Sequence, residues 1–147
     1  MQGEHLCEKV EIKDTDEYLE YLDDFRPATA FIAIVQPDGF DEEDPVIVEA
    51  DACMELVGAY KTNNWPGTRT REPRAQQHMY KASREFFDYL YDIPAFFFNE
   101  IGLDGSVGGV ELTEFGIDDI IFLDRKKNIL LYTTTHEGGI YLNEDYK

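Results

Sequence analysis

The chain has 147 residues, of which 31 are acidic and 13 basic, so its formal net charge at pH 7 is −18. This excess of carboxylates disfavours direct binding to nucleic acid or to anionic membranes, and it favours association with basic proteins. Because 43% of the residues are apolar and 14% are aromatic, a disordered acidic protein is excluded, and we expect one globular domain over residues 1–147.

The N-terminal residues lack the apolar segment of a signal peptide, and no apolar run is long enough for a transmembrane helix. The two cysteines, Cys7 and Cys53, suit a reducing compartment, although a disulfide between them is an open alternative. We therefore expect a cytoplasmic protein.

The first half of the chain predicts a helix, a strand and a second helix. Asp14 or Thr15 can cap a helix over residues 15–25, which ends at Arg26-Pro27. The apolar run 28–35 predicts a strand buried on both faces. Apolar residues then recur at helical spacing from Val46 to Tyr60, but the β-branched start of this segment also fits a strand. Only residues 51–60 are therefore predicted as helix without an alternative.

Two clusters of carboxylates are candidates for contact with a basic partner. One lies on the polar face of the first helix, and the other lies in the loop 36–44, whose acids lack the spacing of an EF-hand. The alternative is that both clusters are merely solvated, the loop acids favouring the N-terminus of the next helix. The candidates are Asp16, Glu20, Asp23 and Asp24 on the helix, and Asp38, Asp41, Glu42, Glu43 and Asp44 in the loop.

The stretch 61–84 reverses this charge, with six basic residues and one acidic residue around the only tryptophan, Trp65. An arginine cluster beside a tryptophan can bind an acidic ligand, which makes the stretch a candidate anion or small-molecule sensor. The interpretation that we favour is an internal electrostatic clasp, in which these cations neutralise the protein's own carboxylates and Trp65 anchors the packing. The arginines concerned are Arg69, Arg71 and Arg74.

The middle of the chain predicts a strand over residues 75–82 and a helix over residues 84–91, capped by Ser83. Seven aromatic residues between positions 86 and 98 predict a large part of the core, with ligand stacking as the alternative. The glycine-rich stretch 99–116 has no phosphate-loop pattern and predicts a long flexible loop, with a brief strand at 110–112.

The C-terminal part predicts a β-hairpin formed by residues 119–123 and 128–135, followed by a turn and a short strand at 140–142. Helices and strands that alternate early and end in a hairpin indicate an α+β (or α/β) fold. We expect a mixed sheet of about four to five strands, packed by three helices.

The best acid–base constellation is His136-Glu137 with Asp118, Asp119 and Asp124 on the neighbouring hairpin. A histidine oriented by a carboxylate can act as a general base, so a small enzyme using His136 with Glu137 or Asp119 is one hypothesis. The alternative is that these residues only form a turn. Because no C-x-x-C or H-E-x-x-H motif occurs, we predict no metal site, and we expect no cofactor.

Two short motifs also suggest a family. The turn Trp65-Pro66-Gly67-Thr68, the strand 121–123 and the strand end Thr135-His136-Glu137 resemble small bacterial proteins with a W-P-G-T turn and a C-terminal T/S-H-E element. Such proteins are similar in type to the immunity proteins of polymorphic-toxin systems. The resemblance implies that the marked positions have either a packing or a functional role; they are Trp65, Gly67, Thr68, His136 and Glu137.

The charge and the resemblance together predict a cytosolic immunity or inhibitor protein that binds a basic toxin such as a nuclease. Carboxylates of such a protein would occupy the phosphate-binding site of the toxin.

Overall fold

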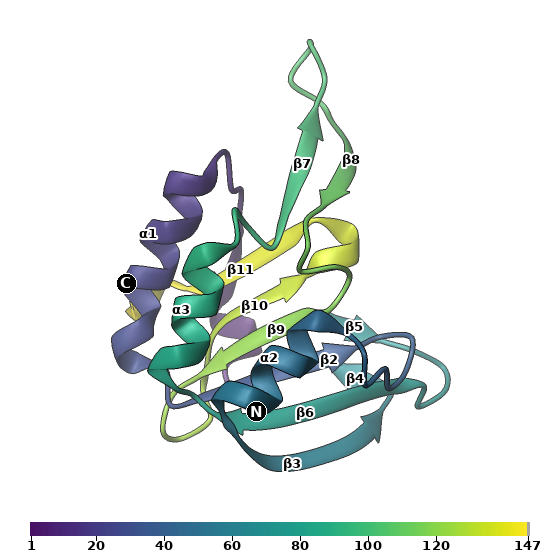
Figure 1. Ribbon diagram of the computed structural model, residues 1–147. Coiled ribbons are helices and arrows are strands. Elements are labelled where there is room, and N and C mark those ends of the chain that lie inside the picture. The colour runs from purple at the N-terminus through teal and green to yellow at the C-terminus, as the bar shows by residue number, and fades with distance from the viewer. Residues whose placement is uncertain (147) are drawn as a thin grey trace.

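The computed structural model describes residues 1–146 and contains a seven-stranded sheet in the order β1-β11-β10-β9-β2-β6-β3. Three helices lie side by side on one face of this sheet, with α3 packed between the other two (Figure 1). The helices are α1 (Thr15–Phe25), α2 (Pro45–Cys53) and α3 (Arg84–Asp92). The strands are β1 (Cys7–Val10), β2 (Phe31–Gln36), β3 (Glu55–Thr62), β6 (Ala75–Lys81), β9 (Asp119–Leu123), β10 (Ile129–Thr134) and β11 (Gly139–Asn143).

Two further hairpins lie outside the sheet, β4 (Asn64–Trp65) with β5 (Thr68–Arg69), and β7 (Phe97–Ile101) with β8 (Val107–Leu112). Short 3-10 turns complete the chain at η1 (Glu4–Leu6), η2 (Arg26–Ala28), η3 (Thr135–Glu137) and η4 (Glu144–Tyr146). The α+β class and the three helices are confirmed. The strand count was too low, and the strands of the large sheet pair antiparallel throughout rather than in a mixed pattern.

The helix over residues 15–25 is confirmed. The Asp14 side chain accepts a hydrogen bond from the Glu17 amide at 2.9 Å, which satisfies one of the free N–H groups of the first turn. Tyr18, Leu22 and Phe25 are buried against the sheet. The strand predicted at 28–35 begins later, at Phe31, because η2 extends to Ala28, and it is buried on both faces.

The helix predicted over residues 51–60 is correct only as far as Cys53 and wrong from Glu55 onwards. The helix is α2, which begins at Pro45 because the Asp44 side chain accepts a hydrogen bond from the Val46 amide at 3.1 Å. From Glu55 the chain is instead the edge strand β3, paired with β6. Val57 and Tyr60 stay exposed, so their helical spacing marks no buried face. Pairing with the neighbouring strand overrides the local pattern.

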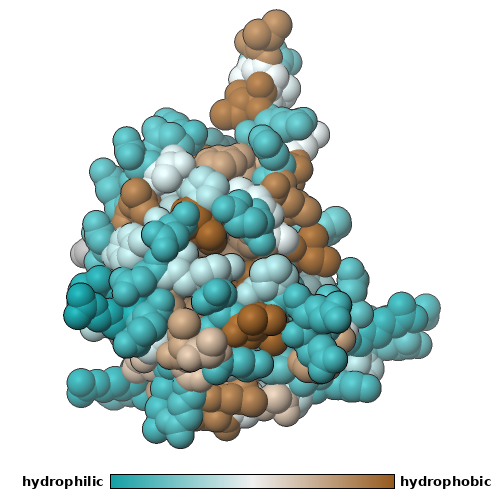
Figure 2. All heavy atoms as spheres, in the orientation of Figure 1, coloured by the Kyte–Doolittle hydropathy of each residue, from teal (hydrophilic) through white to brown (hydrophobic). Residues whose placement is uncertain are grey.

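The long loop predicted over residues 99–116 is wrong, because most of this stretch belongs to the β7–β8 hairpin, which projects from the molecule (Figure 1). The brief strand predicted at 110–112 is confirmed as the end of β8. Its tip is apolar: Ile101 and Leu103 are exposed, and Figure 2 shows hydrophobic atoms gathered there above a largely hydrophilic body. At the base, the Asn99 side-chain amide donates to the Gly138 carbonyl at 3.2 Å, which ties the hairpin to the chain after η3.

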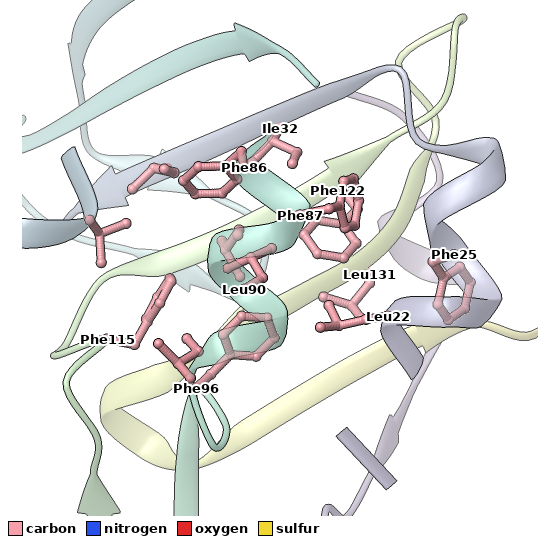
Figure 3. Packing of buried hydrophobic residues seen from close by; sticks show 14 of the residues in the cluster. Leu22, Phe25, Ile32, Phe86, Phe87, Leu90, Phe96, Phe115, Phe122 and Leu131 are labelled. Atoms are coloured by element: carbon pink, nitrogen blue, oxygen red, sulfur yellow. The ribbon is translucent and has the colours of Figure 1, made fainter. Parts of the chain in front are cut away.

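The core has two layers, one on each face of the sheet. The helix side is aromatic, as the sequence predicted: Phe87 of α3 meets Phe122 of β9 edge to face at 5.5 Å between ring centroids, and Leu22 and Leu90 close the space around them (Figure 3). The opposite face is smaller and holds Trp65 beside Tyr132.

The helix–strand–helix order, the strand at 75–81, the helix capped by Ser83 and the C-terminal hairpin follow the prediction. None of the helices in the described residues is long and apolar enough to cross a membrane.

Candidate functional site

The candidate site lies at one end of the sheet, where β2 and β10 end and β9 begins. Val35 pairs with Asp119 at this end, and Ile121 pairs with Tyr132. The acidic loop that follows β2 and the turn η3 that follows β10 therefore start close together in space. The β4–β5 hairpin covers the adjoining part of the sheet face that carries no helices, so three segments distant in sequence meet here.

The Pro66-Gly67 turn of the β4–β5 hairpin packs directly on β10. Gly67 has φ +79°, and a Cβ at this position would lie 2.6 Å from Thr134 Cγ2 and 2.9 Å from Tyr132 Cε2. Both the backbone angle and the close approach require a glycine. The Gly67 amide also donates to a Glu4 carboxylate oxygen at 2.9 Å. These contacts fix the hairpin, and with it Trp65, against the sheet.

Trp65 and Asp119 join the two motifs of the chain. The indole Nε1 of Trp65 donates to Asp119 Oδ2 at 2.7 Å, and the Thr135 amide donates to Asp119 Oδ1 at 2.7 Å. Asp119 is only 4% exposed, and this burial raises the pKa of its carboxyl to about 6, although the two N–H donors act in the opposite direction. Glu137 raises the pKa further by charge repulsion. The carboxylate therefore has good hydrogen bonds and no cation beside it among the described residues.

These elements surround a pocket of about 470 Å³. Three carboxylates, those of Asp38, Asp119 and Glu137, belong to its wall, and none of the residues lining it is a lysine or an arginine. Trp65 supplies an aromatic wall. The remaining lining residues are Pro37, Thr68, Thr70, Ile117, Thr134 and His136. A site of this composition, part apolar and part anionic, suits a cationic group carried on an apolar stem.

Asp118, next to Asp119, turns to the helix side of the sheet. It is 3% exposed, and burial together with a hydrogen bond to Asp44 raises the pKa of its carboxyl to about 9. Asp44 also accepts hydrogen bonds from Gln36 and from the α2 amide of Val46. Asp118 thus belongs to a buried carboxyl pair that holds the acidic loop to the sheet.

The predicted partner-binding acids form two separate groups. Asp16, Glu20, Asp23 and Asp24 are exposed on α1, where Asp23 accepts a hydrogen bond from Tyr91 at 2.6 Å. Asp38, Asp41, Glu42 and Glu43 are exposed in the loop before α2, whereas Asp44 is half-buried as the helix cap. Because α3 lies between α1 and α2, only the loop group adjoins the pocket. We call the loop group, together with Asp119 and Glu137, the acidic end.

Of the electrostatic clasp predicted for residues 61–84, the packing anchor Trp65 is buried as expected, but few of the cations pair with the protein's own carboxylates. Among the described residues, the stretch makes two ion pairs, Arg74 with Glu72 at 3.4 Å and Lys81 with Glu55 at 3.1 Å, and all four side chains are largely exposed. Arg69 and Arg71 pair with no carboxylate of residues 1–146. Arg71 and Arg74 lie near the acidic loop but form no ion pair with it among the described residues. Arg71 and Arg74 line a shallow hollow beside the pocket, together with Asp38 and Glu72.

The general-base arrangement is incomplete in this structure. His136 and Glu137 are exposed in η3 and line the pocket with Asp119, but among the described residues His136 makes no hydrogen bond to either carboxylate, and both Asp119 oxygens are already occupied. Asp124 lies at the far end of β9, where it accepts hydrogen bonds from the Lys126 and Asn128 amides of the hairpin turn.

Sequence reasoning missed the threonines that shape this end of the sheet. The Thr133 hydroxyl accepts from the Ile120 amide at 3.0 Å, and the Thr135 hydroxyl donates to the Asp118 carbonyl at 2.7 Å. Thr134 lines the pocket, and its hydroxyl has no hydrogen-bond partner in the described part of the chain. Three consecutive threonines at a strand end were the available signal.

Within residues 1–146 no group of three or more histidine, cysteine, aspartate or glutamate side chains is placed to hold a metal ion. Comparisons with protein-family models, with curated proteins and with solved structures gave no match.

Proposed function

We propose that this protein is a binding module for a basic protein, most concretely an immunity or inhibitor protein that neutralises a basic toxin such as a nuclease. The observation that carries the proposal is the lack of internal charge compensation. The chain has a net charge of −18, yet the described residues contain only two ion pairs, both at the surface. Most of its carboxylates therefore remain available to an external cation.

The acidic end is the contact surface that we propose. Two of its carboxylates are close enough to repel one another, since Glu137 raises the pKa of Asp119 by charge repulsion. A basic surface docked here relieves this repulsion, so binding gains free energy that a solvated loop alone does not supply. The acids of α1 contribute to the long-range field rather than to the contact.

The same chemistry explains how such a protein inhibits. A nuclease site is basic because it binds phosphate, and a rigid array of carboxylates can occupy it in place of the nucleic acid. The rigidity comes from the hydrogen bonds of Gln36 to Asp44 and to the Asp41 carbonyl, which fix the loop on the end of β2. Rigid carboxylates lose little conformational entropy on binding.

The test is to recover the partner from native host cells with the intact chain and then to measure the dissociation constant in a salt series. A basic protein is expected, and affinity should fall at least tenfold between low and moderate salt, because the contact depends on unscreened charge. Recovery of no protein partner, or of one whose affinity does not change with salt, contradicts the proposal.

A further inference from the structure

We propose that the pocket beside Trp65 receives one arginine side chain of the basic partner. This inference rests on the proposed function and adds to it the group that the site recognises and the place where it binds. The pocket is formed by Trp65 of the β4–β5 hairpin, by Pro37-Asp38 of the acidic loop and by His136-Glu137 of η3.

The charge of the wall selects a cation. Asp38, Asp119 and Glu137 line the pocket, and no lysine or arginine does. Arg71 and Arg74 line the adjoining hollow, and neither pairs with Asp38. An anionic ligand would meet repulsion from three carboxylates, so the anion-sensor hypothesis does not fit this pocket.

The most buried carboxylate of the pocket, that of Asp119, favours binding of a cation. Asp119 is almost wholly buried by the fold, since it is 4% exposed, and its two hydrogen-bond donors are neutral N–H groups. A buried carboxylate is stabilised far more by a cation than by neutral donors alone. Thr134 belongs to the same wall, but its hydroxyl oxygen, which has no hydrogen-bond partner among the described residues, is buried against Gly139 and is not open to a bound cation.

Arginine fits better than lysine for reasons of shape. Its planar guanidinium has five N–H donors, forms two parallel hydrogen bonds to one carboxylate and stacks on an indole. The ammonium of lysine is instead a strongly hydrated point charge. The apolar part of the wall, with Pro37 and Ile117 beside Trp65, can cover the aliphatic stem. A volume of about 470 Å³ lies within the size range of ligand pockets in proteins and admits one such side chain.

The only tryptophan of the chain lines the pocket, so its fluorescence responds to binding there; it also lines a second hollow with Glu4 and Tyr60, and variants of the pocket distinguish the two places. The probe is the peptide acetyl-Gly-Arg-Gly-amide, and its matched control replaces arginine by citrulline, which has almost the same shape and no charge. The arginine peptide should shift the emission of the intact protein saturably, with a dissociation constant on the order of 1 mM. The citrulline peptide should leave the emission unchanged.

Variants then locate the effect. Glu137→Gln and Asp38→Asn change exposed side chains, so the fold is retained, and each should weaken the arginine peptide about three- to tenfold. Glu8→Gln removes one charge from the exposed face of β1, away from the pocket, and should change the affinity less than about twofold. Equal binding of both peptides, or no saturable response, overturns the pocket assignment. So does equal weakening by all three variants.

The partner recovered from host cells separates this inference from the function. If the pocket binds an arginine of the partner, the partner competes with the arginine peptide and displaces it from the protein. A partner that binds in a salt-dependent way while the peptide stays bound overturns the arginine pocket and leaves the proposed function standing.

Discussion

The indole of Trp65 donates its only hydrogen bond to the buried carboxylate of Asp119, at 2.7 Å and across 54 positions of sequence. This contact joins the hairpin that lies outside the sheet to the first residue of β9. It brings the W-P-G-T turn and the T-H-E element into one site, because the other oxygen of Asp119 accepts the amide of Thr135. The pocket exists because this contact holds its two walls together.

Replacing Trp65 with phenylalanine should destabilise the protein by roughly 2–4 kcal/mol, because Asp119 loses one of two donors while it stays buried, and a smaller ring leaves a void. Urea unfolding of Trp65→Phe, followed by circular dichroism, measures the change. Combining Trp65→Phe with Asp119→Asn should cost clearly less than the two single changes added together. A loss below about 0.5 kcal/mol for Trp65→Phe would show that the hydrogen bond does not hold the hairpin.

Gly67→Ala should destabilise the protein more than Gly116→Ala does. The two glycines have nearly the same backbone angle, φ +79° and +78°, but a Cβ at Gly67 meets Thr134 and Tyr132 below 3.0 Å, whereas nothing lies within 4 Å at Gly116. Both variants bear the strain of a left-handed residue, about 1–2 kcal/mol. Only Gly67→Ala adds the clash, for roughly 1–3 kcal/mol more. Equal unfolding free energies would mean that the turn does not pack on β10.

Stability should fall as pH rises, because the folded protein holds a proton on Asp118 that the unfolded chain releases. The pKa of this carboxyl is raised to about 9 by burial and by Asp44, against an ordinary value of 3.8 for an aspartate, so its stabilising effect is full below about pH 4 and is lost as pH rises towards 9. The slope attributable to one proton is about 1.4 kcal/mol per pH unit.

The variant Asp118→Asn isolates this proton, since an amide is neutral at every pH. Its unfolding free energy between pH 6 and 8 should be less dependent on pH than that of the wild type, and at pH 8 it should be the more stable protein. Asp119, with a pKa of about 6, loses its proton in the lower part of this window in both proteins, so the comparison of the two profiles cancels its contribution. Parallel pH profiles would contradict the buried carboxyl pair.

His136→Ala should leave the unfolding free energy within about 0.5 kcal/mol of the wild type, because the side chain is exposed and has no hydrogen bond in the described part of the chain. Thermal melting in the same buffer checks this. A decrease in the unfolding free energy well above about 1 kcal/mol would mean that His136 makes a stabilising contact, contrary to the structure.

The local parts of the fold were predictable where sequence signals and burial agree. Asp14 and Ser83 cap their helices as predicted, and the apolar runs of β2 and β9 are buried. The segment after Met54 was not predictable, because apolar residues at helical spacing there belong to an edge strand whose residues are nearly all exposed. Only the pairing of β3 with β6, a long-range contact, decides between the two forms.

The individual residues of the site could be predicted from the sequence, but not that they meet in one pocket. Trp65, Asp38, His136 and Glu137 were each identified from composition or motif, in three separate hypotheses. Which of them meet depends on strand order, because β2, β9 and β10 bring their ends together only in the antiparallel sheet. The predicted pairing of the arginines with the protein's own carboxylates was wrong for a related reason. A sequence shows the net charge along the chain but not which face of the fold each charge occupies.

The claim that the acidic end contacts a basic partner is tested most directly by two charge-matched variants measured against that partner at one salt concentration. The first neutralises four exposed loop acids, with Asp38→Asn, Asp41→Asn, Glu42→Gln and Glu43→Gln. The second neutralises four on α1, with Asp16→Asn, Glu20→Gln, Asp23→Asn and Asp24→Asn.

Both variants lose the same net charge, so a purely long-range effect weakens them equally. We predict that the loop variant raises the dissociation constant at least about tenfold and the α1 variant less than about threefold. Equal weakening, or a larger loss for the α1 variant, would contradict the contact surface proposed for this protein.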